Sequence, residues 1–232
     1  MSHKERTKSA RLILVRHGEG RANIDGVIAG LSGCAGLTEL GRRQVRALDE
    51  RWTQTDFRPD VLVSSPVRRA RESAEILAAG MPGLRVIEDC ALCEMHLGEA
   101  DGLTWQKYNA KYGRFNMTAE PSRPFAPGAE SWADVMTRVR ECMQVLAGQH
   151  IGETVVLVTH AGFVVASVLG LLAVQSSHDR ATLDPGTRRS PAGDAIANGG
   201  IWSASTTLPT WRAPNCRRAI RRAPDTFITG CH

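Results

Sequence analysis

Short apolar runs alternate along this chain with longer segments in which apolar and polar residues mix. The runs are rich in β-branched residues and bounded by polar ones, which predicts buried strands. They lie at 12–15, 61–63, 84–87 and 154–158. The mixed segments between and after them show helical spacing with start and stop signals. The predicted helices cover 38–52, 66–79, 131–149 and 163–172.

This alternation predicts an α/β fold. Strands separated by helices form parallel sheets that are covered on both faces, so we expect a three-layer α/β/α sandwich around a mostly parallel sheet. Pro66 suits a first helical position, and Ser131 with Asp134 three residues later predicts a helix cap. Residues 100–130, with five aromatic residues and three prolines, read as an irregular insertion.

Composition narrows the class of protein. A chain of 232 residues with 42% hydrophobic and 23% charged residues is typical of one globular domain. No apolar run approaches the roughly 20 residues of a membrane span, and the run behind the basic N-terminus is too short for a signal peptide. We therefore expect a cytoplasmic protein that does not bind membranes.

The six cysteines fit reduced thiols in such a compartment. Cys90 and Cys93 form a CxxC pair. A redox motif needs its first cysteine at the start of a helix, and a zinc site needs a second pair of ligands. The sequence shows neither, so we expect ordinary thiols here and no metal.

The net charge of the chain is +5, but the distribution of the charged residues argues against a nucleic-acid-binding protein. From Pro185 onward there are seven arginines against two acidic residues, which leaves 22 basic and 22 acidic residues in 1–184. The excess lies wholly in the tail, and the body is neutral. We therefore expect no nucleic-acid partner.

Two of the predicted strands end alike. Arg16 and His17 follow the first, and Thr159 and His160 follow the last. Ligands of open α/β sheets bind beyond the carboxyl ends of the strands, so both histidines are candidates for one site. A third strand end, SSPVRRA at 64–70, places arginines in the first turn of a helix. The helix dipole disfavours a positive charge at this end, so the arginines suggest that an anion binds beside them.

Histidines at one rim also suggest a metal site, but the neighbouring arginines argue against it. Guanidinium groups repel a cation, and no HExxH spacing is present. The planar fork of arginine suits phosphate oxygens instead. The pattern therefore favours a phosphate pocket in which His17 is the nucleophile.

Four motifs, in order, carry a family resemblance. They are LVRHGEG (14–20), SSPVRRARESAE (64–75), LCEMHLG (92–98) and VLVTHAG (156–162). Together they resemble the histidine phosphatase (phosphoglycerate mutase-like) superfamily over about residues 10–184.

The resemblance implies a role for each matching residue. His17 corresponds to the nucleophile that becomes phosphohistidine, and Glu94 to the general acid–base. Arg16, Arg69 and protonated His160 complete the phosphate pocket, whereas Arg68 is expected to be exposed. Further substrate- or phosphate-binding positions are Asn23, Gly30 and Ala161. The family needs no metal or organic cofactor.

The resemblance also bears on the reaction. The stretches LCEMHLGEADGLTW (92–105) and PGAES (127–131) are more similar to the phosphatase branch than to the glycolytic mutases. We therefore expect hydrolysis of a small phosphomonoester, with a phosphoglycerate mutase, or a non-catalytic phospho-ligand binder, as the alternatives. The 100–130 insertion would cap the pocket, where its basic residues either meet an acidic substrate or form a solvated face. Those residues are Lys107, Lys111, Arg114 and Arg123. The oligomeric state stays open.

The tail departs from the family. Residues 185–232 are rich in Pro, Arg and Gly and lack periodicity, which is typical of disorder. When the codons from Gly186 are regrouped by one base, they permit the Asn-Thr-Ser-Ile with which the family continues. The sequence thus predicts a catalytic domain over 1–184, a frameshifted tail after it, and C-terminal edge strands that are missing or disrupted.

Overall fold

The fold is built on one five-stranded sheet. The computed structural model describes residues 9–171 and 202–204. The strands lie in the order β3-β2-β4-β1-β5. Four of them are parallel, and β5 runs antiparallel to β1. Their bounds are β1 Arg11–Arg16, β2 Val61–Ser64, β3 Val86–Glu88, β4 Thr154–Thr159 and β5 Trp202–Ala204.

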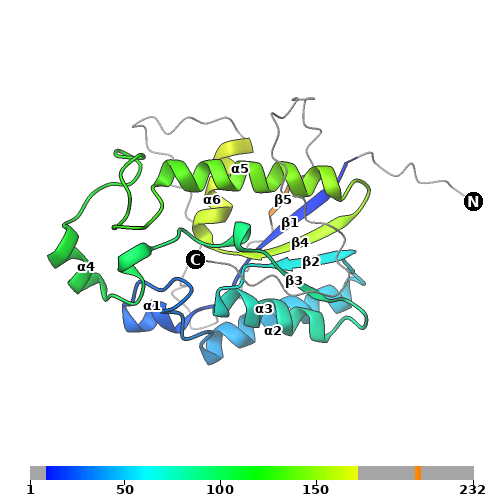
Figure 1. Ribbon diagram of the computed structural model, residues 1–232. Coiled ribbons are helices and arrows are strands. Elements are labelled where there is room, and N and C mark those ends of the chain that lie inside the picture. Colours follow the sequence, from blue (N-terminus) through cyan, green and yellow to red (C-terminus); the bar gives the residue numbers. More distant parts are fainter. Residues whose placement is uncertain (1–8, 172–201, 205–232) are drawn as a thin grey trace, which may run out of the picture.

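Helices cover both faces of the sheet, with α5 and α6 above it and α2 and α3 below (Figure 1). Their bounds are α1 Arg21–Asp25, α2 Glu39–Gln54, α3 Arg68–Ala79, α4 Trp105–Tyr112, α5 Trp132–Gln149 and α6 Ala161–Leu171. Two short 3₁₀ turns, η1 Cys90–Leu92 and η2 Gly98–Ala100, follow β3. The α/β sandwich predicted from the alternation is thereby confirmed.

The two-residue period of the strands divides the core between these layers. Leu12 and Leu14 of β1 pack with α5 and α6, whereas Ile13 and Val15 pack with α2 and α3. Successive side chains of a strand point to opposite faces, so apolar runs without alternation are required where both faces are covered. That explains why the strands read as continuous apolar runs.

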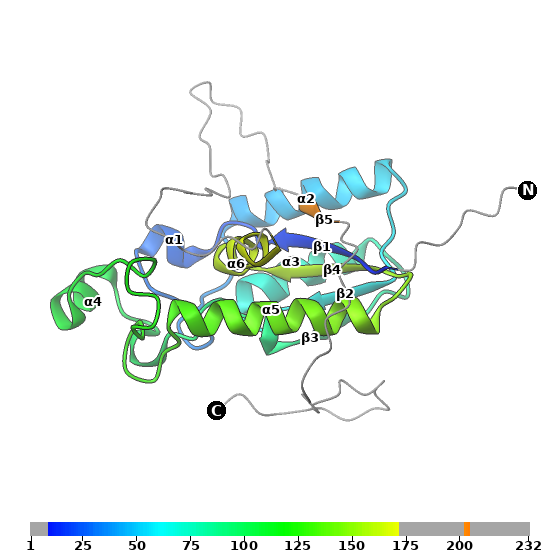
Figure 2. The same cartoon turned by 90° about the horizontal axis from the view of Figure 1, so that it is seen from above.

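The insertion lies beyond the carboxyl ends of the strands, and α4 is its most distant part (Figure 2). Helix α4 begins after Thr104, whose side chain accepts a hydrogen bond from Lys107 N. Tyr108 stacks on Phe125 at a centroid separation of 4.5 Å and donates to Phe125 O at 2.6 Å. The prediction of a wholly irregular insertion was therefore wrong, because an N-cap and an aromatic contact stabilise one helix within it.

Other differences are small. Helix α3 begins at Arg68 and not at Pro66, because Ser65 Oγ accepts the Val67 N–H and forms a turn first. The predicted capping box of Ser131 and Asp134 is present at the start of α5. The edge position beside β1 is occupied by the short strand β5, which pairs with three residues of β1. The rest of the proposed frameshifted tail lies outside the described residues.

Candidate active site

The two strand-end histidines lie side by side. Arg16 of β1 is paired with Thr159 of β4, so His17 and His160 follow at the same level of the sheet. His17 N donates to Thr159 O at 3.0 Å, and the two imidazole centroids are 5.0 Å apart. Parallel pairing of β1 and β4 thus brings together residues 143 positions apart in the sequence.

Arg69 joins both histidines. It lies in the first turn of α3 and is 7% exposed. Its Nε donates to His17 Nε2 at 2.9 Å, and its Nη2 donates to His160 Nδ1 at 3.0 Å. Its Nη1 donates to Ala29 O at 2.9 Å, which fixes the guanidinium from the far side. Arg68, by contrast, is exposed and pairs with Glu72.

The hydrogen bonds of His17 determine its tautomer. Its Nδ1 lies 2.6 Å from Gly18 O, a pure acceptor, so Nδ1 carries the proton. Nε2, which faces the Arg69 donor, therefore holds the lone pair. Burial, together with the charges of Arg69 and Arg16, lowers the pKa of His17 to about 3. The imidazole is neutral at physiological pH, as a nucleophile must be.

Without a phosphate in the pocket, His160 is neutral too. Burial and the nearby His17 and Arg69 hold its pKa well below the usual value. Because Nδ1 accepts from Arg69, Nε2 carries the proton and donates to Ser65 Oγ at 2.9 Å. Without a bound anion, a positive imidazole beside a guanidinium is unfavourable. The half-buried Arg16 also contributes to this positive field.

Glu94 reaches the same end of the sheet from the segment after η1. Its Oε2 accepts the Gly162 N–H at 3.1 Å, in the first turn of α6 and two residues beyond His160. Thr159 Oγ1 donates to Leu92 O at 2.7 Å, which fastens this segment to β4. The structure thus brings His17, Arg69 and His160 into direct contact and places Glu94 beside them.

Arg138 of α5 is a residue that the sequence analysis missed. Its guanidinium donates to three main-chain oxygens in the segment that carries Glu94, namely Ala91 O at 2.9 Å, Cys93 O at 3.0 Å and Glu94 O at 3.2 Å. A two-pronged ion pair with Glu130, at 2.7 and 2.8 Å, holds the guanidinium. Arg138 lies three residues after buried Val135, and an arginine on the buried face of a helix was the available signal.

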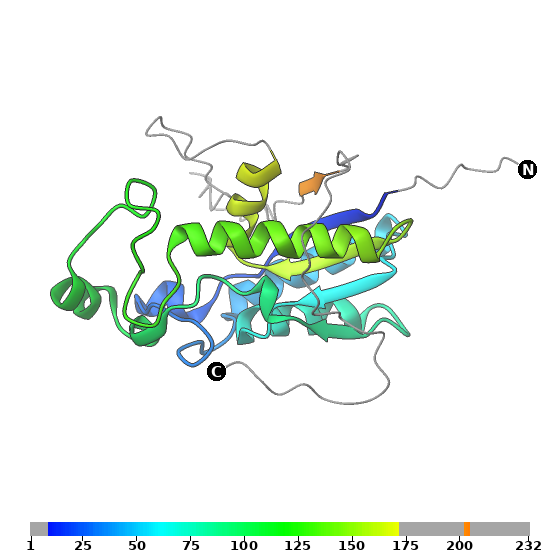
Figure 3. The ribbon, with the colours of Figure 1, turned by 45° about the horizontal axis from the view of Figure 1, so that its top comes forward.

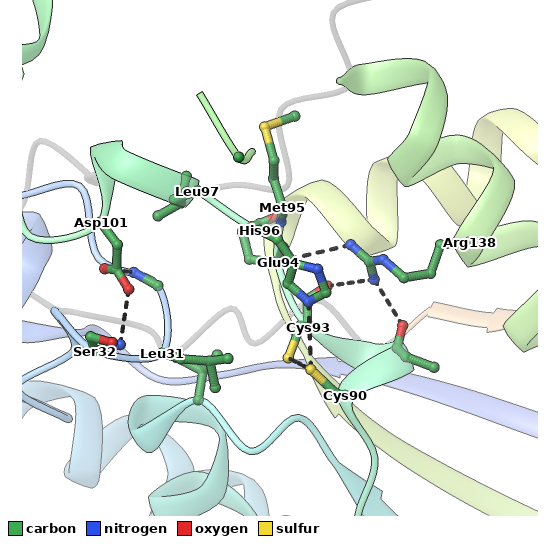
Figure 4. A pocket seen from close by; sticks show the side chains of 15 residues that line it. Leu31, Ser32, Cys90, Cys93, Glu94, Met95, His96, Leu97, Asp101 and Arg138 are labelled. Carbon is green, nitrogen blue, oxygen red and sulfur yellow. Dashed lines mark hydrogen bonds between the residues drawn. The ribbon is translucent and has the colours of Figure 1, made fainter. Parts of the chain in front are cut away.

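A cavity of about 500 Å³ borders Glu94 (Figure 4). Gly30, a predicted phosphate-binding position, lines this cavity. Its N–H donates to Asp101 Oδ1 at 2.7 Å. Asn23 is exposed on α1, and Ala161 is the half-buried first residue of α6. These three residues have no direct contact with His17 among the hydrogen bonds of the described residues.

Of the basic residues in the insertion, two are paired with acids. Lys111 lies 2.9 Å from Glu99, and Arg123 lies 3.1 Å from Glu120 and over the Phe115 ring. Both therefore fit the solvated-face alternative. Across residues 9–171 and 202–204, no helix is both long and apolar enough to pass through a membrane.

Comparison with known proteins agrees with this geometry. Residues 12–187 match the model of the histidine phosphatase superfamily, branch 1. The chain is 31% identical over 178 residues to a metal-independent phosphoserine phosphatase of Arabidopsis thaliana, covering 75% of this chain and 74% of the relative. It is 29% identical over 169 residues to a 2,3-bisphosphoglycerate-dependent phosphoglycerate mutase of Brucella canis, covering 70% and 82%.

Solved structures give the same result. A mycobacterial glucosyl-3-phosphoglycerate phosphatase in complex with VO3 is 33% identical, with a TM-score of 0.60 over 71% of this chain and 82% of that one. The phosphoserine phosphatase of Entamoeba histolytica, bound to 3-phosphoglyceric acid, is 27% identical, with a TM-score of 0.60 over 72% and 82%. This chain is therefore an enzyme of the histidine phosphatase superfamily, branch 1.

Proposed function

We propose that the protein hydrolyses a small phosphomonoester through a phosphohistidine formed on His17. The observation that carries this proposal is the hydrogen-bonding of His17. Nδ1–H donates to Gly18 O, which leaves the Nε2 lone pair facing the arginine that would bind the phosphate. That lone pair becomes available for attack when phosphate oxygens take over the Arg69 donor.

In the first step, Nε2 attacks phosphorus in line, the N–P bond forms and the ester P–O bond breaks. The phosphate oxygens replace His17 as the acceptor for Arg69 Nε, while Arg69 Nη1 stays anchored to Ala29 O. Arg69 and Arg16 then neutralise the charge on the equatorial oxygens. Charge stabilisation of this kind supplies most of the acceleration in phosphoryl transfer.

Glu94 supplies the proton that the leaving alkoxide takes. In the second step a water attacks phosphorus, Glu94 accepts a proton from it and the N–P bond breaks, which restores His17. Proton transfer from a positioned acid is worth about 10²–10⁴-fold in rate. Arg138 is a positioning residue here, because it holds the main chain that carries Glu94.

His160 has a different role before and after the substrate binds. In the unliganded pocket it is neutral and connects Arg69 to Ser65. A phosphate dianion beside the ring raises its pKa, because an opposite charge stabilises the imidazolium. We infer that the substrate itself brings His160 to the protonated state, in which it donates to the phosphate.

Hydrolysis is favoured over mutase activity by the Glu94 segment, which resembles the phosphatase branch, and by similarity to two phosphatases with different substrates. The relatives also include mutases, so a direct test is needed. Release of phosphate from phosphoserine and from 3-phosphoglycerate is measured beside isomerisation of 3-phosphoglycerate. Isomerisation faster than release would overturn the choice.

The intermediate is tested by acid-labile, alkali-stable labelling with a ³²P-phosphomonoester in a rapid quench. We expect the label on the wild-type chain and none on His17→Ala. His150→Ala is the matched control, since His150 lies at the C-cap of α5 and pairs with Glu153. A chain that binds phosphate but takes up no label would instead indicate the non-catalytic alternative.

A further inference from the structure

A second cluster of reactive side chains lies beside the proposed phosphatase site and has no role in its chemistry. Cys90, Cys93 and His96 each offer one ligand atom, and these three atoms all lie within 4.8 Å of one another. Cys90 Sγ is 3.1 Å from Cys93 Sγ and 3.5 Å from His96 Nε2 (Figure 4). All three residues line the cavity that also contains Glu94.

Local structure explains why the ligand atoms converge. Cys90 opens η1, a 3₁₀ turn with three residues per turn, so Cys93 stands directly above it. Arg138 holds the carbonyl oxygens of Ala91, in the middle of this turn, and of Cys93, at its C-cap. His96 then returns over the turn, because its main-chain N–H donates to Glu130 Oε2 at 2.8 Å.

We propose that Cys90, Cys93 and His96 bind a divalent zinc-like cation, with the fourth position open toward the cavity. A tetrahedral zinc ion places its ligand atoms about 3.8 Å apart for two sulfurs and about 3.6 Å apart for sulfur and nitrogen. The two observed distances from Cys90 Sγ, 3.1 and 3.5 Å, lie within about 0.7 Å of these values, and the third pair, Cys93 and His96, lies within 4.8 Å. The proposal is independent of the function proposed for His17.

The surroundings of His96 favour a metal over a disulfide. The sulfur pair alone fits either, since a disulfide of about 2.05 Å is also close to the observed separation. A disulfide between Cys90 and Cys93, however, would not explain why His96 lies beside them. Its Nε2 faces Cys90, while its Nδ1 lies 3.8 Å from Glu130 Oε2. A histidine that binds zinc usually donates its other ring N–H to a carboxylate, and Glu130 lies on that side of His96.

The charges balance as well. Two thiolates neutralise a divalent cation, and Arg138 is already neutralised by Glu130. The CxxC pair lacked a second set of ligands in the sequence, and the fold supplies His96 instead.

The test uses the full chain, reduced, freed of metal with a chelator and titrated with Co²⁺, which reports its ligands by absorption. We expect one Co²⁺ per chain, with the d–d bands of a tetrahedral site and a thiolate-to-cobalt charge-transfer band, both removed by one equivalent of Zn²⁺. Since loss of an outer-shell partner costs 10–100-fold in affinity, loss of a ligand in Cys90→Ser or His96→Gln should cost at least about 100-fold.

Cys142→Ala is the matched control, because it also removes a thiol. Burial raises the pKa of Cys142 to about 12, so this thiol stays protonated, and we expect binding as in the wild type. His96 is 41% exposed in its side chain, so His96→Gln tests the site without disturbing the core. Octahedral cobalt without a charge-transfer band, or equal affinity in His96→Gln, would overturn the proposal. The proposal would also be overturned if the protein in air had an intact mass two hydrogens lower, which indicates a disulfide, and if the reduced protein bound no cobalt.

Discussion

Gly162→Ala tests the role of Glu94 without changing Glu94 itself. A Cβ on Gly162 would overlap Glu94 Oε1 and lie 3.0 Å from its Cδ and 3.3 Å from its Oε2. Ordinary contacts need about 3.5 Å. The carboxylate is the free end of a flexible side chain, whereas Gly162 is fixed in α6, so the carboxylate must leave its place. The hydrogen bond from Gly162 N is then lost.

The expected cost falls on catalysis and not on folding. Losing a positioned general acid lowers kcat/KM by about 10²–10⁴-fold. Alanine in place of a helical glycine gains about 0.5–1 kcal/mol, which offsets part of the lost charged hydrogen bond of about 1.5–3 kcal/mol. We therefore expect the free energy of unfolding to fall by no more than about 2.5 kcal/mol.

The assay compares two leaving groups. Phosphoserine releases an alkoxide that needs a proton, whereas p-nitrophenyl phosphate releases a stable phenolate that does not. We expect a large loss of kcat/KM for phosphoserine and a small one for p-nitrophenyl phosphate. Glu94→Gln should show the same difference between the two substrates. The double variant should lose little more kcat/KM than either single variant, since both changes remove the same interaction of the Glu94 carboxylate.

Gly170→Ala in the same helix is the control, because a Cβ there meets no atom within 4 Å. Wild-type activity of Gly162→Ala toward phosphoserine would refute the general-acid role of Glu94. An equal loss with both substrates would show that Gly162 acts on the phosphate pocket instead.

Three further predictions concern stability and the reading frame. Arg138→Met removes the guanidinium that pairs with Glu130, whose side chain is 16% exposed, so we expect urea unfolding at neutral pH to show a loss of about 3–5 kcal/mol in the free energy of unfolding; a loss below about 1 kcal/mol would contradict the structural role of this pair. His17 takes up a proton near pH 6.5 in the unfolded chain but only near pH 3 in the folded one, so the free energy of unfolding should fall by up to about 1.4 kcal/mol per pH unit as the pH drops below 6.5. His17→Asn should remove this part of the pH dependence. Equal slopes of unfolding free energy against pH in the two proteins would show that His17 is not the group responsible. Resequencing the gene should reveal a one-base change near the codons of Pro185 and Gly186, whereas an unambiguous read in the present frame, with an intact mass of 25.2 kDa, would exclude it.

The order of apolar runs and caps was enough to predict most of the architecture. Strands and helices are local patterns, and each was placed to within a few residues. The errors arose where a tertiary contact decided the outcome. Helix α4 depends on Phe125, 17 residues after Tyr108, and β5 on pairing with β1 (Figure 3).

For the site, the sequence by itself was enough to select the candidate residues. His17 and His160 stand at strand ends, and parallel strands end at one edge, so their proximity followed from the motifs. Only the tertiary structure decided their protonation. A pKa depends on burial and on charges from distant segments, here Arg69 of α3, and no local pattern encodes that field.

The same reason explains Arg138 and His96. Arg138 contacts the Glu94 segment from 44 residues away along the chain, and His96 meets Cys90 only because Glu130 and Arg138 fold the segment back. The sequence selected the residues that we propose as the nucleophile, the phosphate-binding arginines and the acid, because each stands in a motif. The structure decided how that acid is held and which ligands lie together beside it, because these contacts arise only when distant segments pack.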